Sequence, residues 1–349
     1  MLKHLSIIEG AYLADILHQP QALTETLDAL QSSKPLLDLA SRLHRGKFQR
    51  IVLTGMGSSF HALHPLNLQL IGSGFTSVMV ETSELVHYKK RFFDPKTLIV
   101  AVSQSGQSAE MLRLLQVNKG HSAVIAVTNT PESPLARKAD VTVLTKAGTE
   151  FSVSCKTYVA ALMALQWLGA ALCRQDLHRT RKQLAHAAPT VAAYLAGWRE
   201  HVDVLSEKVR DVRHLFLVGR GDSLAAVGTG ALIVKEAVRC HAEGMSSAAF
   251  RHGPFEMLGP DTFVLVFSGD KKTKALNRRL LEDIRRQGSC AELLGEDSPY
   301  SAFRIPQDGI HVRPILEIVP VQMITLAIAA QTGREPGRFE LTSKVTTIE

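Results

Sequence analysis

Short apolar runs alternate with amphipathic segments along most of the chain, a pattern typical of α/β proteins. In the first half, the apolar runs predict five strands, at Arg50–Thr54, Ser77–Glu81, Thr97–Ser103, Ala123–Thr128 and Val141–Leu144. Between them lie segments such as SAEMLRLLQVNKG, whose apolar residues recur at helical spacing. Strands that are apolar throughout are buried on both faces. We therefore expect a parallel sheet flanked by helices, a flavodoxin-like three-layer sandwich.

The chain contains an internal repeat. The run FQRIVLTGMGSS (Phe48–Ser59) and the run VRHLFLVGRGDS (Val212–Ser223) both end in a Gly-x-Gly-x-Ser turn, 164 positions apart. A second pair, TLIVAVS and TFVLVFS, matches at an offset of 165. Two unrelated segments with nearly one offset indicate a duplicated unit. We expect two tandem α/β domains within an organisation of four parts: a helical arm at 1–45, a first domain at 46–185, a second domain at 200–335 and an irregular tail at 336–349.

Composition indicates a globular cytoplasmic protein. Of the 349 residues, 45% are hydrophobic, enough for a sizeable core, and the four cysteines are scattered without a CxxC pair. This spacing favours reduced thiols over disulfides or a zinc site. The most apolar run, Ile315–Ala330, is interrupted by Glu317, Pro320 and Gln322, and the N-terminus lacks a signal-peptide pattern. We expect no membrane association.

The net charge of +7 does not by itself indicate nucleic-acid binding. Lysines and arginines are interleaved with acids, and only 6% of residues are aromatic. The densest basic cluster, Arg174–His186, has the pattern of a solvated helix face. Excess positive charge equally suits a small anionic substrate, so we expect no nucleic-acid partner.

Two turns follow predicted strands directly, where parallel α/β sheets bind ligands. The turn GMGSS lacks the third glycine of the dinucleotide fingerprint, because position 60 is Phe60 and its repeat is Leu224. A nicotinamide cofactor is therefore not expected. The turn instead brings the hydroxyls of Ser58 and Ser59 near a ligand.

The second turn, SQSGQS, is richer in hydrogen-bonding side chains. Four of its residues can donate to phosphate oxygens, namely Ser103, Gln104, Ser105 and Ser108. The N-terminus of the following helix would add N–H groups and a positive dipole end. The loop has no P-loop lysine, which favours a small phosphomonoester over a nucleoside triphosphate. An ordinary helix cap is the alternative interpretation, although one serine would suffice for it.

Three further residues could carry chemistry. Glu236 lies beside apolar Val234 and Ala237, so its carboxylate could act as a base between adjacent carbons. His252 precedes Gly-Pro and could move a proton, and Lys344 could form a Schiff base. Taken alone, each also fits an ordinary structural or solvent-exposed role.

Together these segments resemble the sugar isomerase (SIS) domain family, in particular the isomerase half of glucosamine-6-phosphate synthase. The ordered matches cover about residues 45–349: GMGSS, ETSELVHYKK, SQSGQSAEML, VTNTPESPLARKAD, AGTEFSVSCKTY, the VGRGDS segment through VKEAVRCHAE, RHGPFE and the tail SKVTTIE.

The resemblance implies a role for each candidate residue. It implies phosphate binding by Ser103, Gln104, Ser105 and Ser108, and sugar binding by Ser58, Ser59, Val153 and Cys155. Glu236 would transfer a proton between C1 and C2, His252 would open the sugar ring from the neighbouring subunit of a homodimer, and Lys344 would form an imine. Glu84 would help to shape the pocket. The resemblance implies no metal and no organic cofactor.

The sequence also departs from the synthase pattern. Ile233 replaces a second catalytic lysine, Cys155-Lys156-Thr157 replaces Ser-Thr-Lys, and Gln107 replaces glutamate. The chain begins Met1-Leu2 without an N-terminal cysteine, so we expect no use of glutamine-derived ammonia. We expect a phosphosugar isomerase or deaminase acting on an amino- or keto-hexose 6-phosphate. The alternatives are a non-catalytic phosphosugar sensor and a fructosamine-6-phosphate deglycase.

Overall fold

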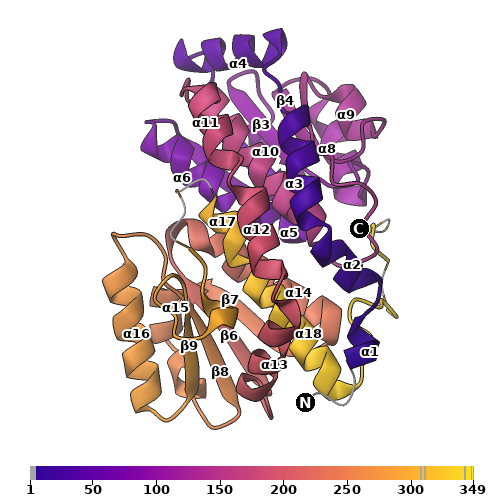
Figure 1. Cartoon of the computed structure of the whole chain (residues 1–349). Coiled ribbons are helices and arrows are strands. Elements are labelled where there is room, and N and C mark those ends of the chain that lie inside the picture. The colour runs from indigo at the N-terminus through magenta and orange to yellow at the C-terminus, as the bar shows by residue number, and fades with distance from the viewer. Residues whose placement is uncertain (1–4, 307–308, 310–311, 342, 347, 349) are drawn as a thin grey trace. The chain divides into compact units, whose positions relative to one another are not determined.

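The computed structural model describes residues 5–306, 309, 312–341, 343–346 and 348. Two compact units account for these residues, and each is named here after the sequence repeat that it contains. The first-repeat unit comprises residues 21–149, 156–186 and 341–349, and the second-repeat unit comprises residues 1–20, 150–155 and 187–340. Each unit thus gathers segments that are distant in sequence (Figure 1).

The first-repeat unit is built on a five-stranded parallel sheet. Its strands are β1 (Arg50–Gly55), β2 (Ser77–Glu81), β3 (Thr97–Val102), β4 (Ala123–Thr128) and β5 (Val141–Leu144). They lie in the order β2-β1-β3-β4-β5, and every neighbouring pair is parallel. This is the flavodoxin-like strand order, so the fold class and the five predicted strands are confirmed.

Helices cover both faces of this sheet. One face packs through Val52, Ile99 and Val124 against α7 (Thr82–Tyr88), α8 (Ala109–Asn118) and α9 (Pro134–Lys138). Helix α10 (Lys156–Leu172) contacts β4 and β5 and is apolar around nearly its whole circumference, which suits its burial under further helices. The remaining helical elements are α3 (Gln19–Ala29), α4 (Lys34–His44), α5 (Gly57–His61), α6 (His64–Gly72), η1 (Lys90–Phe92) and α11 (Leu177–Leu184).

The second-repeat unit contains a four-stranded parallel sheet in the equivalent order, β7-β6-β8-β9. Its strands are β6 (His214–Gly219), β7 (His241–Ser246), β8 (Thr262–Phe267) and β9 (Cys290–Leu294). The repeated turns also match in backbone conformation, since Gly57 and Gly221 both have positive φ, +52° and +60°. The duplication predicted from sequence is therefore a duplication of structure.

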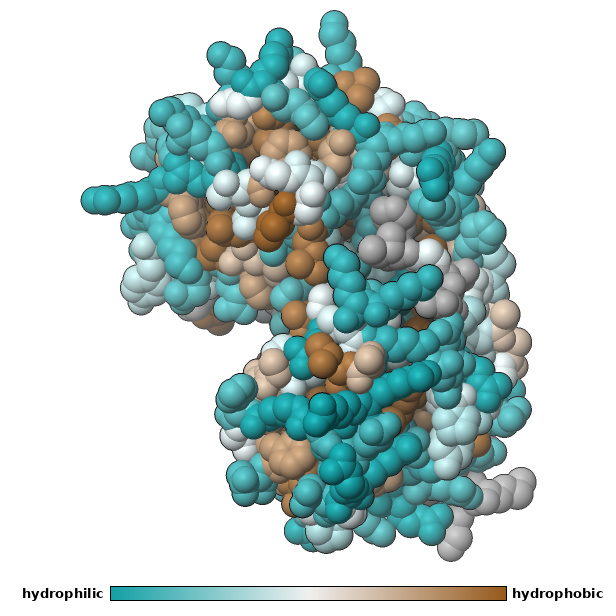
Figure 2. All heavy atoms as spheres, turned by 90° about the vertical axis from the view of Figure 1, so that its left-hand side faces the viewer, coloured by the Kyte–Doolittle hydropathy of each residue, from teal (hydrophilic) through white to brown (hydrophobic). Residues whose placement is uncertain are grey.

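The second sheet is also covered on both faces. Helix α16 (Lys274–Arg286) packs on one face, and α14 (Leu224–Val238) packs on the other with α18 (Val319–Thr332) behind it. The surface that carries α16 faces the viewer in Figure 2 and is hydrophilic, in keeping with the exposed arginines of this helix. The other helical elements are α1 (Leu5–Ile8), α2 (Ala11–Leu17), α12 (Ala187–Leu195), α13 (Trp198–Lys208), η2 (Gly221–Ser223), α15 (Ser247–Arg251), η3 (Pro254–Met257), η4 (Ser301–Phe303) and α17 (Arg313–Glu317).

Two terminal regions add detail to the sequence expectations. The helical arm is interrupted beside Pro20: α2 ends at Leu17, and Pro20 lies in the first turn of the next helix, α3, where its missing N–H costs nothing. The segment Arg313–Thr332, formed by α17 and α18, is long and apolar enough to cross a membrane. In the structure 89% of its most apolar window is buried inside the protein, as in the core helix of a globular unit.

Candidate functional site

Two loops meet at the reversal point of the first sheet. Strands β1 and β3 are neighbours, and the chain leaves them towards opposite sides of the sheet. Parallel α/β sheets bind ligands beyond the carboxyl ends of such a pair of strands. The GMGSS turn follows β1 and the SQSGQS turn follows β3, so both lie where the sequence predicted a ligand site.

Glycines allow the first loop to turn tightly. A Cβ on Gly55 would lie 3.0 Å from the carbonyl oxygen of Val102 on β3, so only a residue without a side chain fits there without a shift. Gly57 begins α5 with a positive φ. Ser58 is buried at 9% exposure and Ser59 is half-buried, both in the first turn of this helix. The loop therefore brings two hydroxyls to the edge of the sheet.

The second loop, residues 103–108, is called the serine loop here. Its turn depends on Gly106, which has φ +62° and whose Cβ would lie 2.2 Å from the Ser133 Oγ. The Gly106 N–H donates to the Ser103 Oγ at 3.1 Å. Ser103 is 8% exposed, so its hydroxyl serves the shape of the loop in this structure.

The last residue of β4 and the two residues after it hold the serine loop from the side. The carbonyl oxygen of Gln104 accepts hydrogen bonds from the Thr128 hydroxyl at 3.2 Å, the Asn129 N–H at 3.1 Å and the Thr130 hydroxyl at 3.3 Å. The sequence analysis gave these three residues no role. The matched segment VTNTPESP was the available signal, but only the fold shows that it supports the serine loop.

The end of the serine loop coincides with the start of α8. Ser108 is the N-cap residue, with extended backbone, but its hydroxyl makes no capping hydrogen bond. The Ser105 Oγ accepts only a long hydrogen bond, 3.4 Å, from the Gln107 N–H. Both serines are half-buried. Together with the N-terminal N–H groups of α8, these hydroxyls form a donor-rich site suited to an anion.

The C-terminal tail reaches this same place. The carbonyl oxygen of Thr346 accepts a hydrogen bond from the Ala109 N–H, at 3.1 Å, in the first turn of α8. Lys344, two residues earlier, is half-buried and belongs to the first-repeat unit with the serine loop. The structure thus brings the tail to the serine loop, whereas tail residues Thr342, Thr347 and Glu349 lie outside the described residues. Glu84 is exposed on α7.

The other predicted residues lie in the second-repeat unit. Glu236 is half-buried near the end of α14, while Val153 and Cys155 are fully buried. The Glu150 carboxylate accepts hydrogen bonds from the Cys155 N–H at 2.9 Å and the Cys155 thiol at 3.4 Å. Cys155 is therefore held by a carboxylate five residues earlier in the sequence.

A buried tyrosine lies close to these groups. Burial raises the pKa of the Tyr12 hydroxyl well above its usual range, and the Cys155 thiol and the carboxylates of Glu236 and Glu150 raise it further. The hydroxyl lies 3.3 Å from the Thr325 Oγ1. The segment before the first repeat therefore contributes to the surroundings of Glu236, which the sequence analysis did not anticipate.

His252 also belongs to the second-repeat unit. It follows α15, is exposed, and precedes Gly253, which has φ +127°. Its backbone N–H donates to the Ala249 carbonyl oxygen at 2.9 Å.

The equivalent reversal point of the second sheet is filled by protein. The Ser223 hydroxyl, the repeat of Ser59, donates to the buried Glu317 carboxyl at 2.8 Å. Lys274, next to the end of β8, forms ion pairs with Glu296 and Asp297. The cavity beyond the carboxyl ends of β8 and β9 has a volume of only about 10 Å³, room for a single water. Of the two repeats, the first carries the open polar loop.

Comparisons with known proteins agree with this architecture. The family model described as the SIS domain matches residues 46–171 and 208–291. The chain is 26% identical over 356 residues to the glutamine–fructose-6-phosphate aminotransferase (isomerizing) of Shewanella oneidensis, and 28% identical over 352 residues to that of Pyrococcus horikoshii. These alignments cover 97% and 98% of this chain but 58% of each relative, so the chain spans little more than half the length of these proteins.

Solved structures show the same fold. The C-terminal domain of glucosamine-fructose-6-phosphate aminotransferase from Francisella tularensis superposes with a TM-score of 0.84 at 22% identity, covering 95% of this chain and 98% of that one. A candidate phosphosugar isomerase from Silicibacter pomeroyi gives a TM-score of 0.76 at 26% identity, covering 92% and 98%. With two structural repeats and a family match over both, this chain belongs to the SIS domain family.

Proposed function

We propose that this protein is a phosphosugar isomerase or deaminase that acts on an amino- or keto-hexose 6-phosphate. The serine loop carries the proposal, because its uncapped Ser108 hydroxyl lies at the N-terminus of α8 on the reversal point of the sheet. Related folds include proteins named tagatose-6-phosphate ketose/aldose isomerase and glucosamine-6-phosphate deaminase. We propose a cytoplasmic homodimer as the working form.

The phosphate would anchor the substrate. Ser105 and Ser108 would donate their hydroxyl hydrogens to phosphate oxygens, with added attraction from the dipole of α8. Ser103 and Gln104 would act chiefly by holding the loop, since the Ser103 Oγ accepts from the Gly106 N–H and the Gln104 carbonyl oxygen accepts from Thr128 at the end of β4. Binding energy from the phosphate end would then orient the carbonyl end for reaction.

Glu236 would transfer the proton. In an open-chain hexose phosphate, its carboxylate would take the proton from C2 and deliver it to C1, or the reverse, through an enediol or enolamine. With an amino sugar, the proton that moves from C2 to C1 leaves an imine at C2. Hydrolysis of that imine consumes one water and releases ammonia and the keto sugar. Lys344 would form a transient imine with the ketose carbonyl, and His252 would open the ring.

Turnover of candidate substrates tests this proposal. The protein is incubated with glucosamine 6-phosphate, fructose 6-phosphate and fructosamine 6-phosphate, and isomers and ammonia are measured. We expect one of the first two to react, and we expect Glu236→Gln to abolish the reaction while phosphosugar binding persists. Glu207→Gln, an exposed glutamate of the same unit, is the control. Binding of phosphosugars without any turnover would establish a sensor instead, and turnover of fructosamine 6-phosphate alone would establish a deglycase.

The anchoring role has its own test. Removing the Ser108 hydroxyl deletes a charge-assisted hydrogen bond to phosphate, so Ser108→Ala is expected to raise KM about tenfold or more with a smaller change in kcat. The matched control is Ser73→Ala, whose exposed hydroxyl lies outside the serine loop and donates to the Gln69 carbonyl oxygen four residues earlier. Equal KM values in the two variants would contradict the phosphate-binding role.

The imine role is tested separately. Borohydride reduces an imine irreversibly, so we expect covalent labelling of Lys344 when it is added with a reactive ketose phosphate. Lys344→Ala is expected to lose the label and at least 100-fold in kcat/KM. Full activity of this variant would exclude the covalent role.

A further inference from the structure

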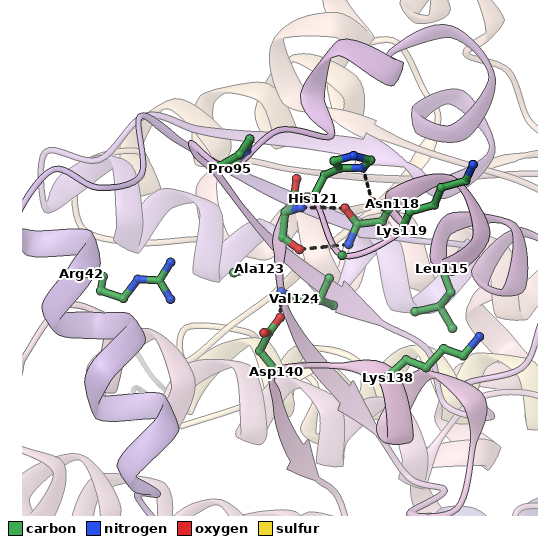
Figure 3. Close-up of a pocket in the computed structure, with 12 residues that line it drawn as sticks. Arg42, Pro95, Leu115, Asn118, Lys119, His121, Ala123, Val124, Lys138 and Asp140 are labelled. Carbon is green, nitrogen blue, oxygen red and sulfur yellow. Dashed lines mark hydrogen bonds between the residues drawn. The ribbon is translucent and has the colours of Figure 1, made fainter.

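A second cavity lies at the opposite end of the first sheet. It has a volume of about 410 Å³ and lies at the amino ends of β3 and β4, whereas the serine loop follows the carboxyl end of β3 (Figure 3). We call it the β4-edge cavity, lined among others by Arg42, Lys119, His121, Lys138 and Asp140. A six-residue strand spans about 20 Å, so this cavity is separate from the candidate active site.

Three cations surround the β4-edge cavity. Arg42 comes from α4, Lys119 ends α8 in a left-handed conformation with φ +47°, and Lys138 ends α9. Among the residues that the structure describes, none of the three forms an ion pair. Other cations of this unit do, such as Arg50 with Asp94 at 3.0 Å. Their positions at helix C-termini make the charges favourable locally. All three residues line the cavity, and the Arg42 guanidinium also lies over the Phe48 ring, 4.9 Å from its centroid.

The walls of the cavity are already hydrogen-bonded. The Asn118 side chain donates to the Ser122 carbonyl oxygen at 3.0 Å and accepts from the Ser122 N–H at 2.9 Å. The His121 Nδ1 lies 2.7 Å from the Asn118 carbonyl oxygen, which can only accept, so Nδ1 carries the hydrogen. The Asp140 carboxylate accepts from the Val124 N–H at 2.8 Å. These bonds preform the cavity, which lowers the cost of binding.

The charge of the cavity favours an anion. Arg42, Lys119 and Lys138 supply three positive charges against the single carboxylate of Asp140, and Figure 3 shows the Arg42 guanidinium directed towards the space in front of β4. A phosphate monoester carries close to two negative charges at neutral pH. The volume also leaves room for an organic body, which Leu115 and Pro95 would contact.

We propose that the β4-edge cavity binds a phosphorylated small molecule at a site distinct from the serine loop. This inference does not depend on the proposed function, because its residues are not those of the candidate active site. The probes are adenosine 5′-monophosphate and glucose 6-phosphate, each compared with its uncharged parent, adenosine or glucose. Calorimetry gives the dissociation constant, and hydrogen exchange locates the site.

We expect at least one phosphorylated probe to slow backbone exchange across residues 119–124, and the parent compound not to do so. Lys119→Gln with Lys138→Gln is expected to weaken that binding about tenfold, since both lysines are exposed and their charges are removed without disturbing the core. The matched control is Lys89→Gln with Lys90→Gln, two exposed lysines of the same unit outside the cavity.

A variant that removes a negative charge from the cavity provides a second test, because it is expected to change the affinity in the opposite direction. Asp140→Asn keeps an acceptor for the Val124 N–H but removes the negative charge, so it is expected to tighten binding severalfold. Unchanged exchange at 119–124 with millimolar probe would overturn the proposal. Equal affinity of the Lys119/Lys138 variant and its control for the phosphorylated probe would also overturn it. Slowed exchange confined to residues 103–109 would assign all binding to the serine loop and would likewise overturn it.

Discussion

Glu317 shows how a single residue closes the second reversal point. One carboxyl oxygen accepts the Ser223 hydroxyl at 2.8 Å, and the other has no hydrogen-bond partner among the described residues. Burial raises the pKa of this carboxyl from 4.5 to about 8, although the Ser223 hydrogen bond and the Arg313 charge lower it. Burial also raises the pKa of nearby Asp222, to about 6. Glu317 is therefore protonated in the folded protein at neutral pH.

This shift predicts a pH dependence of stability. Because the folded protein holds the Glu317 proton up to about pH 8 and the unfolded chain releases it near 4.5, this group's contribution to the free energy of unfolding falls as pH rises between these values. Glu317→Gln keeps the acceptor for Ser223 and is expected to flatten the fall. Urea unfolding at pH 5, 6, 7 and 8 measures how the free energy of unfolding changes with pH, and Glu282→Gln, a substitution of an exposed glutamate, is the control. Equal slopes in the two variants would contradict the prediction.

At the scale of elements, the serine loop depends on contacts with the segment after β4. Its backbone turn at Gly106 passes so close to Ser133 that a Cβ cannot be placed, and the Gln104 carbonyl accepts three hydrogen bonds from residues 128–130. Ser133 in turn caps α9 by accepting from the Ala136 N–H at 3.2 Å. The loop, β4 and α9 thus form one connected structure.

Gly106→Ala is expected to disrupt this structure. The alanine would adopt an unfavourable positive φ and its Cβ would overlap Ser133, so we expect a loss of about 1–3 kcal/mol in the free energy of unfolding and weakened phosphosugar binding. Gly74→Ala separates the two causes, because Gly74 has φ +86° but open space around its Cβ. Chemical denaturation and calorimetry measure both variants. An equal loss in the two variants would show that the contact with Ser133 is unimportant.

At the scale of the whole molecule, the exposed position of His252 fits a role in a second subunit. If each active site combines Glu236 of one subunit with the partner's His252, the variants Glu236→Gln and His252→Ala are each inactive alone. Mixed dimers formed by refolding the two together would contain one intact site. We expect activity to return to roughly a quarter of the unmutated protein, since half of the dimers are mixed and each has one of two sites intact.

The control for this experiment mixes two variants of the same residue. When Glu236→Gln and Glu236→Ala are refolded together, we expect no recovery of activity, because no site in the mixed dimers contains the Glu236 carboxylate. Size-exclusion chromatography with light scattering establishes whether the refolded species are dimers. No recovery in the Glu236→Gln and His252→Ala mixture, although dimers form, would place His252 outside the partner's site.

Local patterns in the sequence determined the strands, the repeat and the two polar turns. A strand buried on both faces must be apolar, and the close approach of Gly55 to β3 leaves little room for a side chain, so these features are visible in the residues themselves. The family followed from the order of such segments. The residue roles carried over with the resemblance remain predictions, because geometry within each unit does not test chemistry.

Only the tertiary structure decided which distant segments meet. Thr346 accepts from the first turn of α8, Tyr12 lies in the electrostatic surroundings of Glu236, and residues 128–130 hold the Gln104 carbonyl. None of these pairings has a local signature, because hydrogen bonds and burial depend on the path of the chain through space. The same holds for the β4-edge cavity, whose three cations come from three separate helices and acquire a common role only through the sheet between them.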